Sequence, residues 1–65
     1  MEFELRVDFL LRNIYKHKKT AIKKAEDLRK LYSRLNINYK SIIITKVDNN
    51  KREIIYINNP LETNF

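Results

Sequence analysis

The stretch EFELRVDFLLR (residues 2–12) alternates between apolar and polar side chains over almost its whole length. Its odd-numbered positions carry the apolar side chains Phe3, Leu5, Val7, Phe9 and Leu11. A period of two indicates a β-strand with one buried face. We therefore expect a single strand over residues 2–12, with these five side chains in the core.

The period changes after Thr20. The apolar side chains now recur every three or four residues, at Ala21, Ala25, Leu28, Tyr32 and Leu35. This spacing is typical of an amphipathic helix. Thr20 can act as the N-cap, although the helix could also begin within residues 14–19. Asn36 or Asn38 suits the left-handed position at the C-terminal end.

Residues 41–58 show the pattern of a β-hairpin. Two runs of β-branched and aliphatic residues flank Asp48-Asn49-Asn50-Lys51, and Asn is the best residue after Gly for the positive φ angles of a tight turn. The expected cross-strand pairs are Asp48–Lys51, Lys46–Glu53, Ile44–Ile55 and Ile42–Ile57. This register joins opposite charges and places four isoleucines on one face.

Together these elements predict a single small α+β domain with the order β-α-β-β over residues 1–58, followed by an irregular tail over 59–65. A helical crossover would place strands 2–12 and 41–47 parallel, with strand 52–58 between them and antiparallel to both. The expected fold is a three-stranded sheet in the order first, third, second, with the helix on one face. The expected core is Phe3, Leu5, Val7, Phe9, Leu11, Ala21, Ala25, Leu28, Tyr32, Leu35, Ile42, Ile44, Ile55 and Ile57.

The composition excludes several classes of site. The chain has no Gly, so it lacks the glycine loops that cradle phosphates, and no Cys, so it lacks disulfides, zinc fingers and thiol nucleophiles. One His and scattered carboxylates predict no metal site and no cofactor. Nothing assembles a nucleophile with a base, so we expect no enzyme. A domain this small buries only about 60% of its unfolded surface, which favours a second subunit or a partner.

Positive charge is concentrated in one segment. The net charge of the chain is +6, and residues 12–40 hold ten Lys or Arg against two acidic residues. Around the expected helix start, a cation costs about 0.3–1 kcal/mol against the helix dipole, whereas an anion is attracted. The candidate residues for binding nucleic acid or another anion are Arg12, Lys16, His17, Lys18, Lys19, Lys23 and Lys24. The alternative is that these residues serve solubility alone.

A second candidate surface is the sheet face turned away from the helix. In the expected register it carries Ile43, Ile54 and Tyr56 as neighbours, and contiguous apolar patches tend to mark interfaces. These three residues are predicted to contact a protein partner or a second copy in a homodimer. Two alternatives remain: the tail covers this face with Leu61 and Phe65, or the register is off by one.

The leading hypothesis is a small non-enzymatic basic protein that binds the nucleic acid backbone through the lysine-rich loop and helix N-terminus. The alternative is an inhibitor or adaptor that binds an acidic protein surface, and a nuclease using His17 is a third. Nine Ile, nine Lys and eight Asn suggest an AT-rich genome and a phage or mobile-element source. The acidic first residues and the short apolar runs predict a cytoplasmic protein, in the host cell if phage encoded, with no membrane partner.

Overall fold

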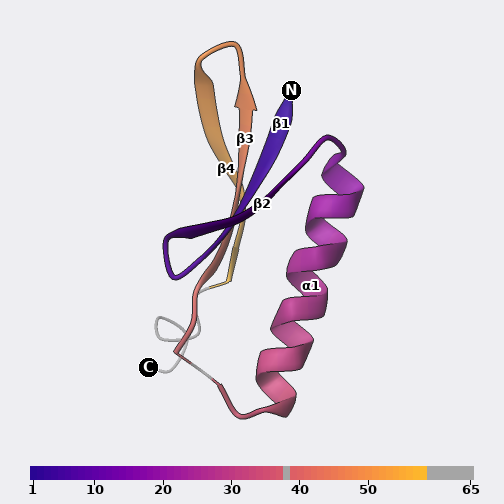
Figure 1. Ribbon diagram of the computed structural model, residues 1–65, viewed down its shortest axis with the longest axis vertical. Helices are drawn as coiled ribbons and strands as arrows, with labels where there is room; N and C mark the ends of the chain where they lie inside the picture. The colour runs from indigo at the N-terminus through magenta and orange to yellow at the C-terminus, as the bar shows by residue number, and fades with distance from the viewer. Residues whose placement is uncertain (38, 59–65) are drawn as a thin grey trace.

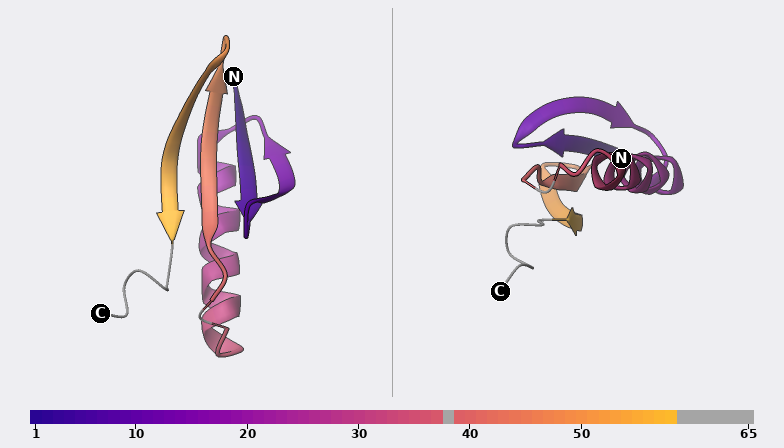
Figure 2. Two further views of the ribbon diagram at one scale, coloured as in Figure 1. Left: turned by 90° about the vertical axis from the view of Figure 1, so that its left-hand side faces the viewer. Right: turned by 90° about the horizontal axis from the view of Figure 1, so that it is seen from below.

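The structure, a computed structural model, describes residues 1–37 and 39–58. Within these residues the elements are, in order, β1 (Glu2–Val7), β2 (Leu10–Tyr15), α1 (Lys18–Arg34), β3 (Ile42–Asp48) and β4 (Lys51–Asn58) (Figure 1). The strands form one antiparallel sheet in the order β2-β1-β3-β4, with α1 on one face (Figure 2). The predicted α+β class is confirmed, whereas the predicted three-stranded sheet is wrong. The predicted tail, with Leu61 and Phe65, lies outside the described residues.

The extra strand arises because the chain reverses at Asp8 and Phe9. Both residues have positive φ, 52° and 68°, as two-residue hairpin turns require. The apolar alternation continues through this turn, so the periodicity did not reveal it. The turn is held by Ser41, which directly precedes the neighbouring strand β3. The Asp8 N–H donates to the Ser41 carbonyl at 3.0 Å, and the Asp8 carboxylate accepts from the Ser41 N–H at 3.1 Å.

This first hairpin also explains the sheet order. Because β2 reverses the chain, the helical crossover joins β2 to β3, and these two strands are parallel with β1 between them. β1 therefore pairs directly with β3, and β4 becomes an edge strand instead of the predicted central one. Figure 2 shows the four strands side by side, with α1 behind them.

Helix α1 begins earlier than Thr20 and ends at the predicted cap. His17 is the N-cap, and the first helical hydrogen bond runs from the Ala21 N–H to the His17 carbonyl at 3.1 Å. At the C-terminal end Asn36, one of the two predicted candidates, has a φ of 57°, and the other candidate, Asn38, lies outside the described residues. The Asn36 N–H donates to Ser33 and the next N–H donates to Tyr32, which is the Schellman pattern.

The second hairpin keeps the predicted register near its turn. Asn49 and Asn50 both have positive φ, and the pairs Asp48–Lys51 and Lys46–Glu53 form as expected. A β-bulge then shifts the pairing between Ile44 and Thr45. Such a bulge adds one residue to a strand and moves every side chain beyond it to the opposite face.

The extra residue is Ile55, so the predicted pairs Ile44–Ile55 and Ile42–Ile57 are wrong. Ile44 pairs with Tyr56 and Ile43 with Ile57. Tyr56 therefore lies on the helix side, where it packs against the core, and Ile57 lies on the outer face.

The core lies between α1 and the two central strands. Ile42, Ile44, Ala21 and Ala25 are all 0% exposed, and Phe3, Leu5 and Val7 complete the buried apolar set. Each fully buried isoleucine contributes about 1.5–3 kcal/mol, while the two alanines let the helix approach the sheet closely. Leu28, Tyr32 and Ile55 pack against this cluster, as predicted. Four predicted core residues are instead exposed: Phe9, Leu11, Leu35 and Ile57.

Candidate functional site

Six of the seven predicted basic residues lie between the end of β2 and the second turn of α1, and the seventh, Arg12, lies earlier, within β2. We call the seven together the basic end. All seven side chains are exposed, and the first turn of α1 contains no acidic residue. The basic end consists of the residues singled out by the sequence: Arg12, Lys16, His17, Lys18, Lys19, Lys23 and Lys24.

The helix start adds its own positive potential to the basic end. His17 has extended backbone angles, φ −122° and ψ 132°, and its side chain makes no capping hydrogen bond. The N–H groups of Lys18, Lys19 and Thr20 precede the first intrahelical donor, so they have no partner within the helix. Free backbone donors and exposed lysines thus occupy the same first turn of the helix, a combination that suits a bound anion.

Ion pairs neutralise little of this charge. Lys23 Nζ lies 3.7 Å from a carboxylate oxygen of Asp27. Glu26, the other acidic residue of α1, is held by Arg29 at 2.8 Å. Among the residues that the structure describes, Lys23 is the one member of the basic end with an ion pair.

A β-bulge in β2 determines where Arg12 lies. Leu5 pairs with Asn13 and Arg6 pairs with Leu11, so Arg12 is the extra residue of the strand. Neighbouring side chains of a regular strand point to opposite faces. Because of the bulge, Arg12 and Asn13 instead both line a groove on the helix side of the sheet.

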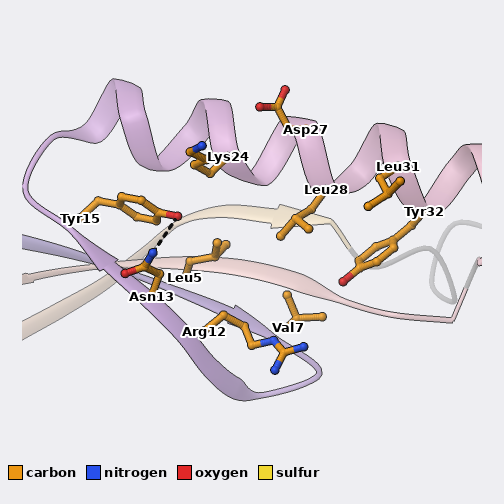
Figure 3. Close-up of a pocket in the computed structure, with 10 residues that line it drawn as sticks. All are labelled: Leu5, Val7, Arg12, Asn13, Tyr15, Lys24, Asp27, Leu28, Leu31 and Tyr32. Atoms are coloured by element: carbon orange, nitrogen blue, oxygen red, sulfur yellow. Dashed lines mark hydrogen bonds between the residues drawn. The ribbon is translucent and has the colours of Figure 1, made fainter.

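This groove runs between β2 and α1 and has a volume of about 350 Å³ (Figure 3). Its base is apolar, with Tyr15 toward one end and Tyr32 toward the other, and Arg12 and Lys24 approach it from the strand and the helix (Figure 3). The lining residues are Leu5, Val7, Arg12, Asn13, Tyr15, Lys24, Asp27, Leu28, Leu31 and Tyr32.

Polar contacts position two of the lining side chains. The Asn13 amide nitrogen donates to the Tyr15 hydroxyl at 3.3 Å, and its amide oxygen accepts from the Ile14 N–H at 2.8 Å. At the other end, Lys40 Nζ lies 6.0 Å from the centre of the Tyr32 ring. The groove therefore combines two half-buried aromatic rings with an oriented amide and cations.

On the opposite side, the outer sheet face carries a charged cluster across its centre. The Glu4 carboxylate on β1 accepts hydrogen bonds from Arg6, at 2.6 Å, and from Arg52 on β4. The Arg6 hydrogen bond lowers the pKa of Glu4 below its ordinary value, Arg52 contributes to the lowering, and burial opposes it. This cluster links β1 to β4 over the intervening strand β3.

Apolar side chains flank this cluster on both edge strands. Ile54 and Ile57 on β4 are 56% and 58% exposed, and Leu11 and Ile14 on β2 are also exposed. Of the three predicted interface residues, Ile43 and Ile54 lie on this outer face. Ile43 pairs with Arg6, and Ile54 pairs with Thr45, which is itself the partner of Glu4.

Tyr56 is not on this face, and its predicted placement is wrong because of the bulge at Ile55. The tyrosine packs against the core near α1. Burial raises the pKa of Tyr56 above its usual value, and the charge of Glu26 adds to the rise while Arg29 opposes it.

The sequence pattern did not predict this groove, because nothing in it indicated that Tyr15 shares a cavity with Asn13 and Tyr32. The available signal was Asp8, a common turn residue, which could have divided residues 2–12. Residues 10–15 would then have been read as a separate edge strand beside the helix.

Comparison of the chain with family models, with curated proteins and with solved structures found no match. Within residues 1–37 and 39–58, no group of three or more His, Cys, Asp or Glu side chains could hold a metal ion. None of the helical segments in this described part has the length and apolar character needed to cross a membrane.

Proposed function

We propose that this protein binds the sugar-phosphate backbone of nucleic acids through the basic end. The observation that carries the proposal is the arrangement of this surface. Exposed cations surround a helix start whose first N–H groups have no partner in the helix, and the first turn contains no carboxylate. Phosphate oxygens are the ligands that such a combination of charge and donors attracts.

The contacts would be mainly to phosphates. Helix α1 packs on the sheet through Ala21 and Ala25, so this face cannot enter a major groove. Phosphate contacts position a protein on nucleic acid but carry no base sequence information. We therefore expect affinity with weak sequence preference.

The test compares two double variants with the same loss of charge. Lys18→Gln/Lys19→Gln removes two cations from the N-terminal end of α1, and Lys30→Gln/Arg34→Gln removes two from its C-terminal half. None of the four residues has an ion pair among the described residues. Binding to a labelled oligonucleotide is followed by fluorescence anisotropy.

The N-terminal variant should bind more weakly, with a salt slope smaller by about one for each lysine removed. The C-terminal variant should stay close to the unaltered protein. Equal losses in the two variants would mean that the binding follows net charge, and the basic end would not be the site.

The outer sheet face supports a second candidate function, the binding of a protein as an inhibitor or adaptor. The specific observation is the exposure of Ile54 and Ile57 beside a charged centre. Contiguous exposed apolar side chains tend to mark protein interfaces. Light scattering of the purified protein tests the homodimer form of this idea: a dimer mass that Ile57→Asn reduces to a monomer mass supports it, and a monomer mass at all concentrations contradicts it.

A further inference from the structure

We propose that the groove between β2 and α1 receives unpaired bases, so that the preferred ligand is single-stranded nucleic acid. This inference rests on the proposed function and names the form of nucleic acid that the same region would take. It is carried by the groove, which is separate from the first turn of the helix.

The size and chemistry of the groove suit a flat aromatic ligand. Its volume of about 350 Å³ falls within the range of small-molecule sites, which span about 300–1,000 Å³. Leu28 and Leu31 on α1 face Leu5 and Val7 on β1, which gives an apolar slot (Figure 3). Leu31 is 38% exposed, so part of this apolar surface is in contact with water when the groove is empty.

The tyrosines supply stacking surfaces. Tyr15 and Tyr32 lie toward opposite ends of the groove (Figure 3), and both are only half-buried. Successive bases of a single strand stack on such rings with little dependence on sequence. In a duplex the faces of the bases are covered by neighbouring pairs, so these rings would have nothing to stack on.

The charges along the groove fit a strand that enters from the basic end. Arg12 and Lys24 approach the groove from its two sides, where they can contact phosphates on either side of an inserted base. The carboxylate in the lining, Asp27, is already held by Lys23 at 3.7 Å.

The oriented amide of Asn13 adds a polar contact for a base. Its nitrogen donates one hydrogen to Tyr15 and retains a second hydrogen, and its oxygen keeps one lone pair after accepting from Ile14. An amide in this state can donate to and accept from the edge of an unpaired base. The β2 bulge is what brings this amide and the Arg12 guanidinium to the same side of the strand.

The experiment compares single-stranded ligands of equal length with a duplex of the same strand length, which carries twice their charge. The probes are oligothymidylate, oligouridylate, a self-complementary DNA duplex and an abasic deoxyribose-phosphate strand, with oligoglutamate as an acidic peptide. Oligothymidylate should bind about tenfold more tightly than the abasic strand, as one stacked base would produce. It should also bind more tightly than the duplex, and oligouridylate shows whether RNA is accepted as well as DNA.

Two tyrosine variants locate the effect. Tyr15→Leu keeps an apolar side chain but removes one ring, and it should reduce the preference over the abasic strand, with Tyr32 retaining its stacking surface. Tyr39→Leu is the matched control, because Tyr39 is 57% exposed and does not line the groove. If Tyr15→Leu fails to fold, quenching of tyrosine fluorescence in the unaltered protein replaces it, since the chain has no Trp to mask that signal.

Each outcome decides a different point. Equal affinity for oligothymidylate, the duplex and the abasic strand would overturn this inference and leave the proposed function standing. Tight binding of oligoglutamate would also overturn it, in favour of an acidic protein ligand. Failure of every nucleic acid probe to bind would refute the proposed function itself.

Discussion

If the lysines at the start of α1 serve binding at the expense of stability, replacing them should make the fold more stable. Lys18 and Lys19 occupy the first two positions of the helix, where the backbone dipole presents positive charge. Neither lysine has an ion pair among the described residues that would offset this repulsion. The double variant Lys18→Gln/Lys19→Gln therefore relieves an unfavourable interaction and should break no contact.

The size of the effect follows from the exposure of both side chains. A cation in the first turn costs about 0.3–1 kcal/mol, with exposed groups toward the lower end, so the two together cost about 1 kcal/mol. In a domain of this length, a gain of 1 kcal/mol raises Tm by about 4–8 °C. Lys and Gln have similar helix propensities, so the propensity difference adds little.

Thermal unfolding followed by circular dichroism at low salt measures this shift. The control, Lys30→Gln/Arg34→Gln, removes the same charge but includes Arg34 in the last turn, where a cation is favourable. It should leave Tm unchanged or slightly lower. A rise of Tm in both variants would attribute the gain to lower net charge, and a fall in the N-terminal variant would refute the dipole reasoning. Salt should reduce the difference, because both groups are exposed.

The remaining predictions concern the outer face and the first turn. Glu4→Gln should lower the free energy of unfolding by about 1 kcal/mol at neutral pH, because the hydrogen bonds from Arg6 and Arg52 lose their charged acceptor. The pKa of Glu4 is lowered on folding, so the stability that Glu4 contributes is full above about pH 4.5 and is lost as the pH falls through the folded-state pKa. If the difference in unfolding free energy between the two proteins does not shrink below that pH, this reasoning is contradicted. Phe9→Asn should raise stability by about 0.5–1 kcal/mol, because Phe9 is 77% exposed and has a φ of 68°, whereas Asn tolerates this conformation. Phe9→Leu should change stability little, and a loss on Phe9→Asn would show that the ring makes a contact that its exposure conceals.

The features that the sequence predicted well are those determined by neighbouring residues. The helix was recognised from its apolar spacing. In a chain without glycine, Asn49 and Asn50 were identified as positions of positive φ, and Asn36 was one of two candidates for such a position. The turn at Asn49-Asn50 was also sufficient to set the first pairs of the second hairpin. In each of these cases the local backbone preference and the final structure agree.

The errors come from contacts that are distant in sequence. The turn at Asp8 and Phe9 depends on hydrogen bonds to Ser41, and no local preference would place a phenylalanine at positive φ. The bulges at Arg12 and Ile55 change the face of every residue beyond them, and a strand pattern with few polar positions does not reveal such a shift. The basic end was therefore predictable as a charge cluster, whereas the groove beside it required the structure.

The salt dependence of nucleic acid binding is the most direct measurement of whether the basic end holds a phosphate backbone. Affinity for a single-stranded oligonucleotide is measured at several salt concentrations between about 50 and 200 mM. If the basic end neutralises about five phosphates, log K should fall with log salt with a slope of about −3 to −4. A slope near zero, or affinity too weak to measure at the lowest salt, would contradict binding of the backbone by these lysines.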